Sequence, residues 1–115
     1  MLVNARAGAR YPGPMFVRLG SFEVVPGRLD ELRAIYNRDC VPIVKAAPGN
    51  VDVYLMEPAD GAGPGTGPII ACTIWRTEAD AVAYEASGTA REVVARVKPL
   101  FAGPPTLRSY RITGR

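Results

Sequence analysis

The sequence has no histidine, only two cysteines and a single tryptophan among its 115 residues. Without histidine the chain lacks the usual general base, a common metal ligand and the base of Ser/His and Cys/His nucleophile pairs. A haem ligated by histidine is excluded for the same reason. Cys40 and Cys72 are too few and too far apart for a disulfide framework or a zinc site, so we predict two buried, inert thiols. We therefore expect no metal and no cofactor.

Long hydrophobic runs are also missing. No apolar run approaches the ~20 residues that span a bilayer, and Arg6 and Arg10 interrupt any signal-peptide core. The net charge is +3, and residues 1–14 carry most of that excess. Residues 15–115 are nearly neutral and have no basic stripe interleaved with aromatics, which argues against nucleic-acid binding. We expect a cytoplasmic protein that binds no membrane, with a flexible arm at 1–14 and one domain at 15–115.

What is present is a clear succession of strand and helix patterns. Apolar and β-branched runs predict four strands, and apolar residues at three- and four-residue steps predict a helix after the first strand and another after the third. The predicted strands are 15–24, 50–56, 69–75 and 106–112. The order is β-α-β-β-α-β, which is the ferredoxin-like α+β pattern with an antiparallel sheet.

Several residues predict where the helices begin, bend and end. Pro42 lies inside the first helical pattern and cannot donate to the carbonyl of Arg38, so we expect a kink or a tightened turn there. Thr77 is a candidate N-cap for the second helix, with Asp80 in a capping-box position. We expect Ser87-Gly88 to break this second helix into two pieces. Between the middle strands, residues 58–68 are rich in Gly and Pro and predict a flexible hairpin connection.

Both faces of most predicted strands are apolar. In the third strand Ile70, Cys72 and Ile74 alternate with Ala71 and Trp75, although a sheet with one solvated face should alternate more cleanly between apolar and polar. A second copy of the chain would cover the additional apolar face. The pattern therefore predicts a homodimer.

The residues also resemble a known family. The segment 25–32, Val41-Pro42, Ala47-Pro48-Gly49 and the stretch from Trp75 to Tyr84 are similar to the antibiotic biosynthesis monooxygenases. The resemblance spans about residues 15–113. It implies a dimeric α/β barrel with a pocket in each subunit between sheet and helices. Some members of the family oxidise quinols, anthrones or related polyketides without metal or flavin, others degrade haem, and many have no assigned reaction.

The resemblance places Trp75 beside the pocket, at the end of the third strand. The haem-degrading branch also needs a histidine on the following helix, which this chain does not have. The polyketide oxygenases place an asparagine four residues before the tryptophan, where this chain has Ala71. Their helix tyrosine and arginine have approximate counterparts in Tyr84 and Arg91, at shifted spacing.

From these residues we predict a site for a small aromatic or hydrophobic ligand. The candidate catalytic residues are Trp75, Arg18, Tyr84 and Arg91, and the candidate substrate-binding residues are Tyr36, Asn37, Tyr54 and Thr73. Arginine and tyrosine would stabilise an oxyanion, while Trp75 would form an apolar wall and donate through its indole N–H.

Each candidate also has a structural interpretation. Trp75 can be a core residue, and Tyr36 and Tyr84 half-buried helix aromatics. Arg18 can pair with an acid such as Asp39 or Glu23, and Arg91 can be a solvated helix charge.

Three hypotheses for function follow. The first is a cofactor-independent monooxygenase that acts on a quinol, anthrone or polyketide-type substrate. The second is a non-catalytic dimeric barrel that binds a small hydrophobic ligand. The third is a polyketide cyclase or isomerase on the same fold, because proton abstraction without oxygen needs the same groups.

Overall fold

A computed structural model describes residues 13–61 and 67–115 of the chain. The predicted arm therefore lies almost wholly outside the described residues, as does the middle of the predicted hairpin connection. The strands are β1 (Phe16–Phe22), β2 (Asn50–Met56), β3 (Ile69–Trp75) and β4 (Thr106–Arg111). The helices are α2 (Leu29–Ile35), a π-helical turn (Tyr36–Cys40), α3 (Val41–Lys45), α4 (Glu78–Ala86), α5 (Thr89–Val97) and a 3₁₀ turn (Lys98–Leu100).

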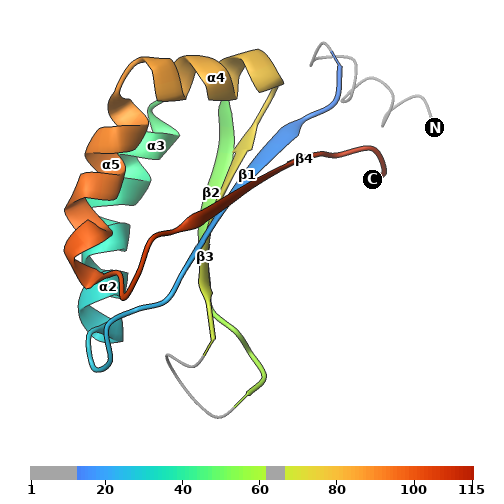
Figure 1. The fold of residues 1–115 in the computed structure, drawn as a ribbon. Coiled ribbons are helices and arrows are strands. Elements are labelled where there is room, and N and C mark those ends of the chain that lie inside the picture. The colour runs from blue at the N-terminus through green and yellow to red at the C-terminus, as the bar shows by residue number, and fades with distance from the viewer. Residues whose placement is uncertain (1–12, 62–66) are drawn as a thin grey trace.

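The strands form one antiparallel sheet in the order β2-β3-β1-β4. This order, with the helices following β1 and β3, confirms the predicted ferredoxin-like α+β fold. All helices lie against the same face of the sheet, and the described chain leaves the other face open (Figure 1). β4 is an edge strand, and each of its residues is exposed.

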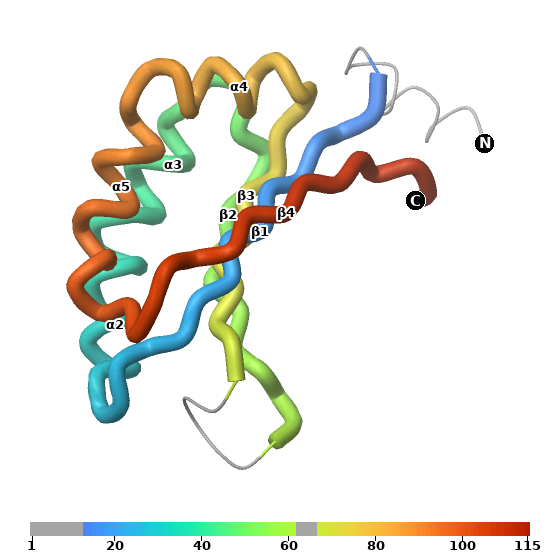
Figure 2. The backbone as a smooth tube through the Cα atoms, viewed as in Figure 1, coloured from blue at the N-terminus to red at the C-terminus, as the bar shows by residue number. Residues whose placement is uncertain are grey.

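The core lies between the sheet and the helical layer, in which α2, α3 and α5 run beside one another (Figure 2). Its largest fully buried side chains come from both layers: Trp75 and Ile69 from β3, and Leu32, Val44 and Leu100 from the helical segments. Burying such side chains is the main favourable term in folding, at roughly 1.5–3 kcal/mol each. No helix in the described ranges is long and apolar enough to cross a membrane.

The first helical segment is disturbed next to Pro42, as predicted, but not by a tightened turn. The helix widens into the π-helical turn Tyr36–Cys40 immediately before α3. Pro42 then falls in the first turn of α3, where the absence of a backbone N–H is tolerated. The wider turn keeps both Tyr36 and Cys40 buried.

The second helical segment begins and breaks where predicted. The Thr77 hydroxyl accepts a hydrogen bond from the Asp80 backbone N–H at 3.1 Å and caps α4. α4 ends at Ala86, and α5 starts after Gly88, whose φ of +87° few other residues adopt. The chain therefore changes direction between α4 and α5 (Figure 1).

Alternate residues of the strands form the open face. Val17, Leu19, Cys72 and Ile74 lie on it, since their neighbours Phe16, Arg18, Thr73 and Trp75 face the helices. Towards the edges of this face, Tyr54, Met56 and Tyr110 are 40–48% exposed. We call these seven residues of the open sheet side, Val17, Leu19, Tyr54, Met56, Cys72, Ile74 and Tyr110, the open face.

Candidate functional site

A cavity of about 140 Å³ lies between the helix-covered side of the sheet and the helices. Two small residues produce it. Gly20 on β1 pairs directly with Ala71 on β3, so the floor of the cavity has almost no side-chain volume. Larger groups surround this floor, and most are apolar or aromatic: Phe22, Tyr36, Val44, Trp75, Tyr84, Val93, Val94, Val97, Phe101 and Leu107.

Trp75 forms one wall of this cavity and is fully buried. Its indole ring packs against the ring of Tyr84, with 4.8 Å between centroids. Its Nε1–H donates to the hydroxyl of Thr73 at 2.9 Å, so that hydrogen bond is satisfied within the protein. Trp75 is thus both a core residue and an apolar wall. Because the indole N–H donates to Thr73, it does not donate to a ligand as we had predicted. Thr73 also lines the cavity.

Tyr36 and Tyr84 line the same cavity, one from the π-helical turn and one from α4. Burial raises the pKa of Tyr84 to about 12, and it raises the pKa of Tyr36 further above its ordinary value of 10. Both phenols therefore keep their protons at neutral pH. They can donate hydrogen bonds to an oxygen atom, but they cannot take a proton from a ligand.

Arg18 crosses the cavity from β1 to α4. Its Nη2 donates to Glu85 Oε1 at 2.8 Å, and its guanidinium lies 5.6 Å from the centre of the Phe16 ring. The predicted acid partners Asp39 and Glu23 are therefore wrong; Asp39 pairs instead with Arg38. Arg18 both lines the cavity and forms an ion pair, which unites the two interpretations of this residue.

Sequence reasoning missed Glu85. An arginine on the helix-facing side of a strand indicates an acidic partner on a helix. The sequence offers three such carboxylates in α4: Glu78, Asp80 and Glu85. The other two have partners of their own. Arg111 donates to Glu78 at 2.9 Å, and the Thr77 hydroxyl donates to Asp80 at 3.0 Å.

Three predicted residues do not line this cavity: Arg91, Asn37 and Tyr54. Arg91 is exposed on α5. Tyr54 lies on the open face, where its hydroxyl donates to Asp52 at 2.6 Å. We therefore do not carry these three residues into the proposed site.

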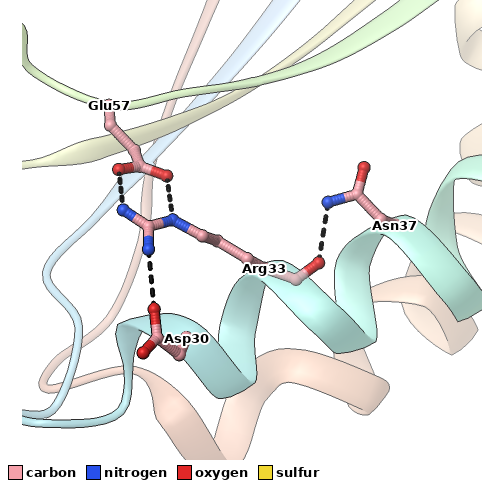
Figure 3. Close-up of polar contacts among 4 residues, drawn as sticks. All are labelled: Asp30, Arg33, Asn37 and Glu57. Atoms are coloured by element: carbon pink, nitrogen blue, oxygen red, sulfur yellow. Dashed lines mark hydrogen bonds and ion pairs between the residues drawn. The ribbon is translucent and has the colours of Figure 1, made fainter.

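Asn37 belongs to a polar cluster on the outer side of the first helical segment (Figure 3). Its amide donates to the Arg33 carbonyl oxygen at 2.8 Å. Arg33 makes two hydrogen bonds to Glu57, at 2.7 and 2.8 Å, and one to Asp30 at 2.7 Å. The Arg33 guanidinium holds the pKa of Glu57 below its ordinary range. This cluster ties α2 to the residue that follows β2.

The comparisons with known proteins agree with this fold. Residues 15–96 match the family model described as antibiotic biosynthesis monooxygenase. The chain belongs to the antibiotic biosynthesis monooxygenase family. The match confirms the resemblance seen in the sequence. The chain has no significant match among curated protein sequences.

Three solved structures illustrate the family fold. A candidate antibiotic biosynthesis monooxygenase from Bordetella bronchiseptica has a TM-score of 0.72 at 22% identity, covering 88% of this chain and 99% of that one. A Streptomyces coelicolor monooxygenase in complex with nanaomycin D has a TM-score of 0.71 at 19% identity, covering 89% and 90%. A Mycobacterium tuberculosis haem degrader with two haems in its active site has a TM-score of 0.69 at 22% identity, covering 87% and 97%.

Proposed function

We propose that this member of the antibiotic biosynthesis monooxygenase family is a cofactor-independent monooxygenase for a small phenolic or quinol-type aromatic substrate. The observation that carries the proposal is the apolar cavity over Gly20 and Ala71, which holds one cation, Arg18, among its described lining residues. The Streptomyces coelicolor relative was solved in complex with the ligand nanaomycin D, which supports the binding of a small organic ligand by this fold. The haem chemistry of the other relative has less support, because this chain has no histidine.

The chemistry needs little from the protein. The substrate loses a proton to solvent and becomes an electron-rich anion. This anion reduces dioxygen directly and, with uptake of a proton, forms a hydroperoxide at the ring or benzylic carbon. Loss of water leaves one oxygen atom as a carbonyl on the product. The four electrons that dioxygen takes up all come from the substrate. Arg18 would stabilise the anion, Tyr36 and Tyr84 would donate hydrogen bonds, and Trp75 would help to exclude water.

Oxygen uptake with a single-ring hydroquinone tests this proposal. We expect uptake above the uncatalysed rate and formation of the hydroxyquinone, which contains one oxygen atom more than the simple quinone of the substrate. Gly20→Val should abolish the oxygen uptake, because the valine side chain fills the cavity floor. The fold should accept this change, because a Cβ at Gly20 lies at an ordinary contact distance of 3.5 Å from the Leu107 side chain. Ser21→Val, one residue along and on the opposite side of the sheet, is the matched control and should keep the activity. No uptake above background would contradict the proposal.

A non-catalytic ligand-binding role is the second candidate, because Ala71 stands where the polyketide oxygenases have a polar residue. This candidate predicts binding that Gly20→Val abolishes, without oxygen uptake. A cyclase or isomerase would convert its substrate without consuming oxygen, so product analysis under anaerobic conditions separates it from both.

We also propose that the protein is a homodimer. Within the described chain, nothing covers the apolar open face, and a second copy in the inverted orientation would cover it with an identical surface. A strand face of this composition is favoured as an interface over a solvated surface. Light scattering should give twice the mass of the chain at micromolar concentration, and a monomer would contradict this assembly.

A further inference from the structure

The Arg18–Glu85 ion pair has an unusual feature for a contact at a cavity. The Nε–H of Arg18 is buried and has no hydrogen-bond partner among the residues that the structure describes. A buried donor without an acceptor is unfavourable, and native proteins contain few of them. The hydrogen-bonding capacity of Arg18 is therefore incompletely used, although its Nη2 donates to Glu85 at 2.8 Å.

The two partners differ in how easily they can separate. The Glu85 side chain is 42% exposed, so its carboxylate would be hydrated if the pair opened. The Arg18 side chain is only 25% exposed and lies against the Phe16 ring inside the sheet–helix layer. Removing Glu85 without a replacement would leave a cation partly buried and unpaired, which is strongly unfavourable. An anionic oxygen is therefore the favourable partner for Arg18, and Glu85 supplies it in this structure.

The other titratable groups around the cavity cannot take this role. They are Tyr36 from the π-helical turn and Tyr84 from α4, and both remain protonated donors. The described lining residues of β3, β4 and α5 are not titratable. Arg111 on β4 is held by Glu78, at the other end of α4. Glu85 is thus the one carboxylate among the described residues of the cavity lining.

We propose that the cavity binds a single-ring aromatic oxyanion, and that the ligand's oxygen replaces Glu85 on Arg18. Glu85 then acts as a competitor that sets which ligands bind. A neutral ring gains no ion pair, whereas an oxyanion exchanges one ion pair for another. A ligand that arrives as a phenol loses its proton: the O–H bond breaks and the electron pair stays on the oxygen. The proton leaves to solvent on the side of the cavity where Glu85 is exposed. This inference rests on the proposed function and names its substrate class.

The size of the cavity limits the ring system. Its volume is about 140 Å³, and an apolar cavity of about 150 Å³ holds one benzene molecule. One ring can lie over Gly20 and Ala71 with its oxygen at Arg18. A phenolate or a benzoate would both supply this chemistry, and an experiment has to distinguish the two.

A spectroscopic titration tests the exchange without any turnover. The probe is 4-nitrophenol, whose phenol and phenolate forms absorb at different wavelengths, with 4-nitroanisole as the matched ring that cannot ionise. We expect the wild type to bind the phenolate at least about tenfold more tightly than the anisole. Arg18→Met should remove this preference, because the cation is gone.

Glu85→Gln gives the opposite and more specific result. Without a competitor, Arg18 should bind the phenolate about tenfold more tightly than in the wild type, and the pKa of the bound probe should fall by about one unit. Glu78→Gln is the matched control, because Glu78 is also a glutamate of α4 paired with a strand arginine, Arg111, at a similar distance. It should leave phenolate binding unchanged. Unchanged or weaker phenolate binding in Glu85→Gln would overturn the proposal.

A measurement on the wild type tests the exchange at Arg18 even if one of the variants does not fold. The Nε–H resonance of Arg18 in a ¹⁵N-labelled protein should move when 4-nitrophenolate is added and stay in place with 4-nitroanisole. Equal shifts with both probes would contradict the exchange. Binding of benzoate but not of the phenolate would support the replacement of Glu85 on Arg18 by a ligand oxygen, but it would overturn the proposed function. Phenolate binding without oxygen uptake would also leave this inference standing while removing the monooxygenase.

Discussion

The two sides of the sheet are built from alternate residues of the same strands, yet they meet different surroundings. On the helix-covered side, Trp75 is fully buried, and the small pair Gly20 and Ala71 leaves a cavity. On the open face, Ile74 and Cys72 lie among apolar neighbours that the described chain does not cover. The covered side is closed by its own helices and has a polar group, Arg18, inside it. On the open side, the described residues of the two central strands, β1 and β3, include no charged group, and the core of a protein interface is typically depleted of charged residues.

The largest expected effect tests this difference with adjacent residues of β3. Trp75→Ala should lower the free energy of unfolding by about 3–5 kcal/mol, because it removes a fully buried ring. Ile74→Ala should cost the monomer only about 1 kcal/mol, because that side chain is only partly buried in the single chain. Urea unfolding at concentrations too low for association measures both. Equal losses would mean that the two sides are equally buried within one chain.

A charge on the open face tests its role as an interface. Ile74→Lys should weaken dimerisation by about 100-fold, because two lysines would be buried without partners across a symmetric contact. Val82→Lys on α4 is the control, since Val82 is 50% exposed on a helix away from this face. Light scattering over a range of concentrations gives the result. A dimer that persists in Ile74→Lys would place the interface elsewhere.

The sequence predicted the fold well because each boundary had its own local signal. β2 and β3 have the predicted bounds, Thr77 caps α4, and Gly88 separates α4 from α5. Pro42 was harder, since a missing N–H predicts a disturbed helix without saying whether it tightens or widens.

The site was predictable only in part. Alternation along the third strand puts Thr73 on the same side as Trp75, and the structure brings both together with Arg18, Tyr36 and Tyr84. The choice of Glu85 over Glu78 depends on how α4 lies across the sheet, which is a tertiary property. The cavity itself depends on the register that sets Gly20 opposite Ala71. Neither feature has a local sequence signal.

The two cysteines allow a chemical comparison of the two sides. Cys40 is fully buried beneath the helices, while Cys72 is 6% exposed on the open face. Burial raises the pKa of both thiols, so we expect neither to be reactive in the proposed dimer. In monomeric Ile74→Lys, we expect Cys72 to react with a thiol reagent about tenfold faster than Cys40. Cys72→Ser identifies the faster thiol, and equal rates would mean that labelling proceeds through unfolding.

The smallest expected effect concerns pH and two tyrosines. The pKa of Tyr84 is about 12 in the folded protein and about 10 in the unfolded chain. Between these values the unfolded state has lost a proton that the folded state keeps, so stability falls as pH rises from about 10. Tyr84→Phe should remove part of this fall, measured as urea midpoints from pH 9 to 11. Tyr54 on the open face has a pKa raised by its hydrogen bond to Asp52, but it is solvent-exposed, so Tyr54→Phe should flatten the curve less. A larger effect from Tyr54 than from Tyr84 would mean that burial under the helices is not what holds the Tyr84 proton.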